Sequence, residues 1–435
     1  MNTPTLNLPT SSVAPSHGRV PGERERLVFF VCSALILLYI VAEAFVFLEP
    51  GVHRSSHIHA AVVPGAIVVL ALIFYGRMHA GLRATIALLF GVFSLVAGLV
   101  ELSDLLRNGL SGDGVLGILV AVAGIALVVL GADLLWISRK RGGSLAWTIA
   151  RRTLLSLAAL FVVYWAVIPV SMAIFATERP RDDVQAADVG RPYQEVTFDT
   201  SDGLTLSAWY VPSENGATVV TFPRAWTIKQ AGMLVSHGYG VLMVDPRGYG
   251  ESEGDPNAYG WGCVKDIAAA TAWLRRQPGI DAARVGGLGL SMGGEQMIEA
   301  AASNEDLSAV VSEGAGFRSV RESLVREGAN SVELYLQYPQ DLMQSLAVWV
   351  LGGEAPPPSL ETAAAQISPR AVFFIYSEKG AASEDMLNGP YYAAADEPKA
   401  VWAVPDAGHT GGIKAQPEEY ERRVIAFFDR ELAAR

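Results

Sequence analysis

The residue best placed to do chemistry in this sequence is a serine flanked by small residues, Ser291. It lies in residues 289–293, Gly-Leu-Ser-Met-Gly, between an apolar run at 284–288 and a helix-like run at 295–302. A strand, a sharp turn and a helix expose a serine at the apex, because small flanking residues let the chain turn tightly. The pattern predicts a nucleophilic serine and therefore covalent hydrolysis.

A second match to the same Gly-x-Ser-x-Gly spacing occurs around Ser252, at residues 250–254. It lies in a polar stretch that ends in Asp255 and Pro256. Turn residues dominate there, so no helix is expected to begin at that serine. The context therefore favours Ser291 as the nucleophile.

Three segments after Tyr193 follow one another in a distinctive order. They are residues 238–254, which include Val-Asp-Pro-Arg-Gly-Tyr-Gly, residues 289–294, and residues 405–409, Pro-Asp-Ala-Gly-His. In order and separation they resemble the α/β-hydrolase superfamily, in the branch that includes dienelactone-hydrolase-like and serine-peptidase-like esterases. The resemblance implies an α/β fold with a mostly parallel sheet, a serine–histidine–acid triad and no cofactor.

A serine hydroxyl needs a base to remove its proton as the bond to carbon forms. Two histidines, His237 and His409, lie after the membrane-like part of the chain. His237 precedes a helix-to-strand turn and is interpreted as a structural or surface residue. His409 follows the last expected strand in a glycine-rich loop, which matches the superfamily order of serine, acid, histidine. We expect His409 to be the general base.

The acid of the triad is less well determined by the sequence. Residues 377–385 replace the usual short loop with an aspartate after the seventh strand. Glu384 is the preferred acid, because the small residues before it allow the loop to reach the histidine. Asp385, Glu313 at the end of the sixth strand, and Glu378 remain alternatives.

An oxyanion formed during attack needs backbone donors. The resemblance implies that the N–H of Met292 is one of them. The second is expected after the third strand, where Pro223 has no N–H, so Arg224 or Ala225 must supply it. The side chain of Arg224 is interpreted as solvated, with an anionic substrate as the alternative partner.

Other arginines in this part are expected to have structural or surface roles. The segment 245–248, Asp-Pro-Arg-Gly, is interpreted as scaffolding for the loop after the fourth strand. Arg318, Arg321 and Arg326 begin a long insertion and are expected on a charged outer face rather than around a substrate carboxylate.

Short β-branched runs alternate with longer helical runs after Tyr193, which indicates a mostly parallel sheet covered on both faces. Residues 201–203 separate the first two strands, so these are expected to form an antiparallel hairpin. The expected strands are 194–200, 204–212, 217–222, 240–245, 284–290, 307–312, 371–377 and 399–404, and the expected helices 225–235, 261–277, 292–302, 384–395 and 416–433. Residues 317–368 form an insertion, with helices near 319–328 and 331–351, that is interpreted as a cap over the active site.

The N-terminal part of the chain is far more apolar. Five stretches have nearly the ~20 residues that a helix needs to cross a bilayer; they are about 27–48, 58–75, 82–102, 115–137 and 151–175. The sequence therefore predicts a disordered tail at 1–26, a transmembrane helical region at 27–175, a linker at 176–192 and a hydrolase domain at 193–435.

Lys and Arg in short connections stay preferentially in the cytoplasm. They are concentrated on one side of the five stretches; the side holds Arg19, Arg24, Arg26, Arg77, Arg83, Arg139, Lys140, Arg141, Arg151 and Arg152. With that side inside, five crossings place the hydrolase domain outside the cytoplasm. Localisation in the plasma membrane is the corresponding expectation.

Composition excludes other classes of function. The net charge of −11 gives no support to nucleic-acid binding. His53, His57 and His59 form a cluster for which metal binding is not favoured, since no cysteine is near. Glu43, Glu101 and Asp133 lie in apolar stretches, where charged groups are either functional or placed near the interface.

Taken together, these features predict a membrane-anchored serine hydrolase of an ester, thioester or amide. The alternatives are a catalytically weak hydrolase fold that binds or senses a ligand, and a transporter with a hydrolase appendage. The substrate is either a lipid-like ester presented by the bilayer or a soluble ester or peptide. Fold alone does not choose between them.

Overall fold

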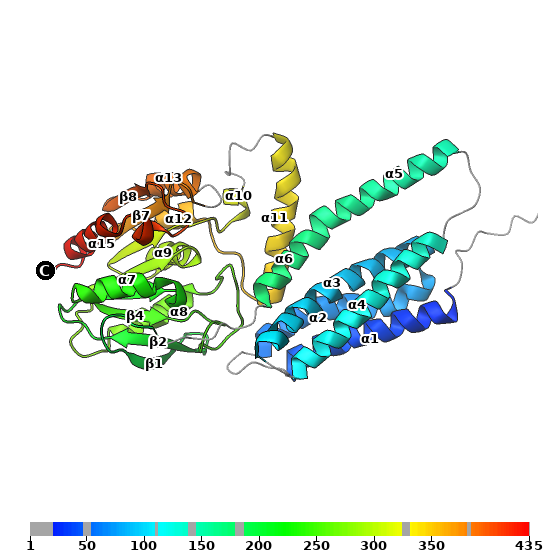
Figure 1. The fold of residues 1–435 in the computed structure, drawn as a ribbon, viewed down its shortest axis with the longest axis horizontal. Helices are drawn as coiled ribbons and strands as arrows, with labels where there is room; N and C mark the ends of the chain where they lie inside the picture. The colour runs from blue at the N-terminus through cyan, green and yellow to red at the C-terminus, as the bar shows by residue number, and fades with distance from the viewer. Residues whose placement is uncertain are drawn as a thin grey trace, which may run out of the picture.

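In the computed structural model of the 435-residue chain, the described residues are 21–46, 54–108, 112–137, 145–178, 187–323, 331–380 and 384–434. The expectations for the tail up to residue 20, for the basic connection at 138–144, and for Arg326 and His53 fall outside these ranges. Figure 1 shows long helices in the N-terminal part and a sheet covered by helices in the C-terminal part.

The C-terminal part is built on one eight-stranded sheet with the order β1-β2-β4-β3-β5-β6-β7-β8. Its strands are β1 Gln194–Asp199, β2 Thr205–Val211, β3 Thr218–Phe222, β4 Gly240–Val244, β5 Val285–Leu290, β6 Ala309–Glu313, β7 Ala371–Ser377 and β8 Lys399–Val404. β1 and β2 form the expected antiparallel hairpin, β2 is antiparallel to β4, and the remaining pairs are parallel. The predicted fold class is confirmed.

Helices cover both faces of this sheet (Figure 1). One core contains side chains of α8 Val264–Leu274, α9 Met292–Ser303, α12 Leu360–Ala364 and α13 Glu384–Ala394. The other core contains side chains of α7 Arg224–Ser236 and α15 Pro417–Glu431. The central strands are buried along their whole length, which explains their continuous apolar sequences.

The N-terminal helices are α1 Glu23–Phe45, α2 Arg54–Phe74, α3 Ala80–Asn108, α4 Gly112–Ile137, α5 Leu145–Val162 and α6 Ile168–Thr177. A π-helical turn, η2 Val163–Val167, joins α5 to α6 in one continuous helix. Four described segments are long and apolar enough to cross a membrane: Glu23–Phe45, Ala80–Leu99, Val115–Leu135 and Leu157–Thr177. The expected number was about five; the described apolar part of the remaining stretch, Pro64–Arg77, is shorter.

α3 and α4 approach each other at backbone distance. A Cβ added at Gly91 would lie 2.8 Å from the carbonyl oxygen of Gly124, so only glycine fits there. Between α1 and α3, the hydroxyl of Tyr39 donates a hydrogen bond of 2.9 Å to Glu101. One of the acids in the apolar stretches therefore has a polar partner.

The long insertion after β6 contains α10 Val320–Ser323, α11 Ser331–Gly352 and α12. α11 lies against α6, between the sheet and the long helix that α5 and α6 form (Figure 1). The indole Nε1 of Trp165 donates a hydrogen bond of 2.9 Å to the carbonyl oxygen of Leu336. The insertion thus contacts the N-terminal helices as well as the sheet.

Candidate active site

Ser291 occupies a sharp turn between β5 and α9. Its backbone has φ 54° and ψ −121°, a conformation that few non-glycine residues adopt. The turn is so tight that a Cβ at Gly289 would lie 2.0 Å from the carbonyl oxygen of Gly293. A Cβ at Gly293 would lie 2.1 Å from the carbonyl oxygen of Phe222. The two glycines of the motif are therefore required by backbone contacts, and they hold the serine at the apex.

His409 lies beside this serine although 118 positions separate them in sequence. The distance between His409 Nε2 and Ser291 Oγ is 2.8 Å, which is within hydrogen-bond reach. Both belong to loops at the carboxyl ends of parallel strands, β5 and β8, and these ends meet at one edge of the sheet. The imidazole is positioned to accept the serine proton.

Glu384 lies on the other side of the imidazole. Its Oε1 is 2.5 Å from His409 Nδ1, and its Oε2 accepts a hydrogen bond of 2.9 Å from the backbone N–H of Ser377. The carboxylate is only 2% exposed. The hydrogen bond that His409 donates to Glu384 raises the pKa of His409 above its ordinary value. The structure thus brings Ser291, His409 and Glu384 together in a line.

The other candidate acids have different surroundings. Asp385 and Glu378 are exposed. Glu313 is buried, but its Oε1 accepts a hydrogen bond of 2.9 Å from the N–H of Gly412, and its Oε2 accepts one of 2.7 Å from Tyr420. Burial raises the pKa of Glu313.

Glu313 therefore supports the turn that follows His409, a role that sequence reasoning missed. The available signal was an acidic residue that ends an otherwise apolar strand. Two backbone hydrogen bonds further join the acid loop to the histidine loop, from Glu378 N to Val404 O and from Lys379 N to Ala407 O. The two loops are thus fixed relative to each other.

The predicted oxyanion donors begin two helices. Met292 is the first residue of α9 and Arg224 the first residue of α7. Because Phe222 touches the backbone of Gly293, the start of α7 lies beside the start of α9. Free N–H groups at helix N-termini stabilise negative charge. The assignment of Met292 and Arg224 as donors stays a prediction.

The interpretation of the Arg224 side chain as solvated is wrong. The guanidinium is 2% exposed, forms an ion pair with Asp245 and lies over the ring of Trp209, 4.4 Å from its centroid. Burial of this cation is possible because a carboxylate and an aromatic face surround it. Arg224 therefore connects α7 to the loop after β4.

The expectation of an outer position for Arg318 is also wrong. Its side chain is 1% exposed, and its Nε and Nη2 each donate a hydrogen bond of 2.7 Å to Glu299 of α9. A second carboxylate, that of Glu295, lies 3.4 Å from the Arg318 guanidinium. Burial raises the pKa of Glu295 to about 7. The buried partners of Arg318 lie far along the sequence, so residue type alone could not place it. Arg321 is exposed, as expected.

Ser252 and Arg247 contact residues that hold the loop after β4 in place. Ser252 is completely buried, and its hydroxyl donates a hydrogen bond of 2.7 Å to the carbonyl oxygen of Asp245. Arg247 pairs with Asp266 and Asp202, which agrees with a scaffolding role for its loop. Neither residue reaches Ser291 through these contacts.

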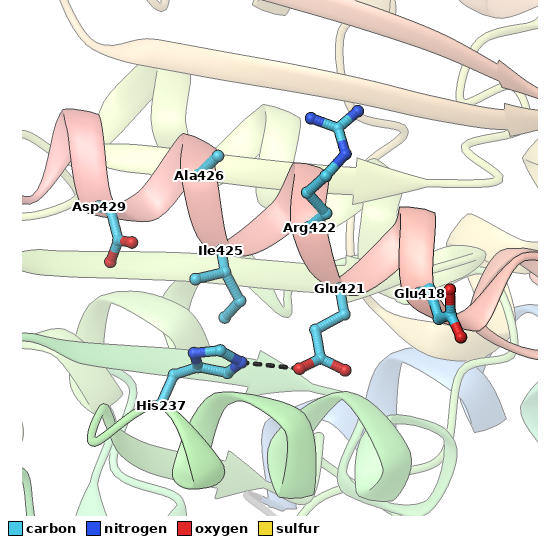
Figure 2. A pocket seen from close by; sticks show the side chains of 7 residues that line it. All are labelled: His237, Glu418, Glu421, Arg422, Ile425, Ala426 and Asp429. Carbon is cyan, nitrogen blue, oxygen red and sulfur yellow. Dashed lines mark hydrogen bonds and ion pairs between the residues drawn. The ribbon is translucent and has the colours of Figure 1, made fainter.

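His237 lies in a surface hollow of about 400 Å³ on α15 (Figure 2). Its Nε2 is 2.8 Å from Glu421 in that hollow. The hollow is lined by His237, Glu418, Glu421, Arg422, Ile425, Ala426 and Asp429. This group contains none of the residues around Ser291, so His237 is a surface residue, in agreement with the sequence interpretation.

Comparison with known families gives an independent result. The family model described as X-Pro dipeptidyl-peptidase (S15 family) matches residues 183–394, a range that includes Ser291 and Glu384. The α/β hydrolase domain-containing protein WAV2 of Arabidopsis thaliana is 32% identical over 111 residues. The C-terminal part of this chain has the α/β-hydrolase fold. The match to WAV2 covers 23% of the chain and 35% of WAV2.

Other relatives of the hydrolase domain are described as hydrolases. Thiohydrolase aneE of Aspergillus aculeatus is 34% identical over 135 residues, which is 28% of this chain and 41% of that protein. The Pyrococcus furiosus esterase Pf2001 has a TM-score of 0.48 and 21% identity, over 58% of this chain and 97% of that one. The matches to aneE and WAV2 each span less than half the length of that relative. The family match and the match to aneE support a hydrolase function.

Proposed function

We propose that this chain is a membrane-anchored serine hydrolase that cleaves an ester, thioester or amide through an acyl-enzyme on Ser291. The observation that carries the proposal is the relay from Glu384 through His409 to Ser291, with distances of 2.5 and 2.8 Å. A nucleophile, its base and the group that orients the base are the parts that acyl transfer needs.

The chemistry follows from this geometry. Ser291 Oγ attacks the substrate carbonyl carbon while His409 Nε2 takes its proton. The negative charge moves to the carbonyl oxygen, where the N–H groups of Met292 and Arg224 are the proposed donors. His409 then protonates the leaving group, and the acyl group stays on Ser291. A water molecule, deprotonated by the same imidazole, releases the acid and restores the serine.

Glu384 assists without taking the proton. Its carboxylate holds the imidazole through Nδ1, so that Nε2 faces the serine, and it stabilises the imidazolium that forms. Because Ser377 N–H binds the second carboxylate oxygen, the acid cannot rotate away easily. The buried position of Glu384 strengthens its effect on the charge of the ring.

Membrane anchoring is the second half of the proposal. It is supported by four described segments that are long and apolar enough to cross a bilayer. The names of the relatives suggest peptide, ester and thioester bonds as substrate classes. An extracytoplasmic position for the hydrolase domain is part of the proposal and rests on the distribution of Lys and Arg.

Substitution of the nucleophile tests the mechanism. We expect Ser291→Ala to abolish turnover of an activated ester and labelling by a fluorophosphonate probe, since the probe must bond to the serine oxygen. Ser308→Ala is the matched control, because Ser308 is partly exposed and its hydroxyl donates a hydrogen bond to the backbone carbonyl of Ala283. Undiminished labelling of folded Ser291→Ala protein would remove Ser291 from this role.

A further inference from the structure

The cap insertion contains a helix with an exposed apolar face. At 100° per residue, six side chains of α11 lie on one side of its axis, and each is between 38% and 47% exposed. We call them the apolar arc: Leu336, Tyr338, Leu342, Met343, Leu346 and Trp349. Soluble proteins seldom leave a contiguous apolar surface of this kind uncovered.

The opposite side of α11 is already occupied. Asp341 accepts a hydrogen bond of 2.5 Å from Ser323 of α10, and Gln344 donates a hydrogen bond to the hydroxyl of Tyr259. Val348 is 1% exposed and packs with Trp261 and with Ala173 of α6. The hydrolase domain and α6 therefore cover the polar side of α11, and the side chains of the apolar arc stay partly exposed.

The surface next to the arc indicates what covers it. α6 belongs to the candidate membrane span Leu157–Thr177, and Trp165 within that span binds the backbone of α11. The span itself exposes large apolar side chains, among them Phe161, Ile168, Met172 and Phe175. The arc, and the span that packs against the other side of α11, therefore both present apolar side chains to the surroundings. Two members of the arc, Tyr338 and Trp349, are residue types that favour the membrane interface.

We propose that the apolar arc of α11 lies in the lipid bilayer beside α6, and that the hydrolase domain takes an acyl ester from that lipid leaflet. This inference rests on the proposed function and deepens it by naming the substrate class. An amphipathic helix with a polar side bound to protein and an apolar side in the acyl-chain boundary is a stable interfacial arrangement.

A short chain of contacts links α11 to the nucleophile. Tyr259, which binds Gln344 of α11, precedes Gly260. The carbonyl oxygen of Gly260 accepts a hydrogen bond of 2.9 Å from Gln296 of α9, and a Cβ at Gly260 would lie 2.9 Å from the side chain of Met292. The loop that contains Tyr259 and Gly260 is therefore packed between α11 and the beginning of α9, the helix that follows Ser291.

The position of the arc can be measured without catalysis. Leu342→Cys in the full chain is labelled with an environment-sensitive fluorophore and placed in vesicles that contain lipids with spin labels on their acyl chains. We expect blue-shifted emission and strong quenching, because the probe lies among acyl chains. Trp226→Cys is the control, since Trp226 of α7 is 50% exposed on the hydrolase domain. The parent, whose Cys32 and Cys263 are buried, is the labelling blank.

Two outcomes of this measurement overturn the proposal. Emission and quenching at position 342 equal to those at position 226 would place the arc in water. Blue-shifted emission that is insensitive to spin-labelled lipid would show that protein, such as a second copy of the chain, covers the arc.

The substrate class has its own test. In the double variant Leu342→Ser/Leu346→Ser, we expect about tenfold slower turnover of a long-chain ester in vesicles, since two leucines lose their lipid contact. Turnover of a short soluble ester should be unchanged, as it should be for both substrates in Trp226→Ser. Equal loss on both substrates would assign the leucines to folding and overturn the proposal. A parent that cleaves only the soluble ester would overturn the substrate class. If Ser291→Ala kept its activity, the proposed function would fail while the quenching result stood.

Discussion

Two neighbouring acids, Glu384 and Asp385, meet very different surroundings. Glu384 is 2% exposed and contacts both His409 and the backbone of Ser377, whereas Asp385 is exposed to solvent. A carboxylate influences an imidazole strongly only when water does not screen the interaction. Because Glu384 is buried against His409 and its neighbour Asp385 is exposed, substitutions at these two positions form a matched test of the contact between Glu384 and His409.

We expect Glu384→Gln to lower kcat/KM for an activated ester by at least about 100-fold, because the amide no longer holds the ring or its charge. His409 accepts a proton only when neutral, and Glu384 raises its pKa. Activity of the parent should therefore fall as pH falls through this raised pKa. In Glu384→Gln the acid limb should move to lower pH. Asp385→Asn should leave both the rate and the profile unchanged, and the opposite pattern would transfer the role to Asp385.

The turn between β5 and α9 depends on backbone contacts rather than on side chains. Gly293 lies so near Phe222 that no Cβ fits without displacement of the end of β3. The end of β3 is also where α7 begins with Arg224, the proposed oxyanion donor. Strand β3, strand β5 and their two helices therefore fix the geometry of the site together.

We expect Gly293→Ala to destabilise the hydrolase domain by about 1–3 kcal/mol, as overpacking does, and to abolish ester turnover. Thermal unfolding and activity are measured together. Gly232→Ala in α7 is the control, since its Cβ would meet only ordinary contacts at 3.8–4.0 Å. It should keep activity and gain about 0.5–1 kcal/mol from the lower entropy of the unfolded chain. A stable, active Gly293→Ala would show that the turn tolerates a side chain.

At the scale of the whole molecule, orientation depends on the number of crossings. The apolar segment Pro64–Arg77, which begins within α2 and is shorter than the other four, decides whether that number is five or four. With the basic tail in the cytoplasm, five crossings place the hydrolase domain outside and four place it inside.

We expect a reporter that is active only outside the cytoplasm to be active when fused after Arg435, because Lys and Arg lie mainly on the opposite side of the spans. A cytoplasm-only reporter at the same position is the control and should be inactive. The reverse result would mean that α2 does not cross.

Local pattern predicted the hydrolase domain well, since the eight strands overlap the expected ranges and β7 and β8 match them fully. The positions of Ser291 and His409 in turns after strands could be predicted, because neighbouring residues encode such glycine-rich turns. The surroundings of Arg224, Arg318 and Glu313 were not, because their partners come from distant segments. Whether a charged side chain is buried depends on such partners, which no local pattern encodes.

The contact of Ala173, Trp261 and Val348 has one more consequence. These three buried side chains come from α6, from the loop beside α9 and from α11, so the hydrolase domain does not swing freely at the end of a flexible tether. With the proposed anchoring in a bilayer, Ser291 would stand at a constant height above the acyl chains. The proposed enzyme would then select substrates by depth: it would reach an ester bond at the height of Ser291 and would not reach one carried on a much longer head group.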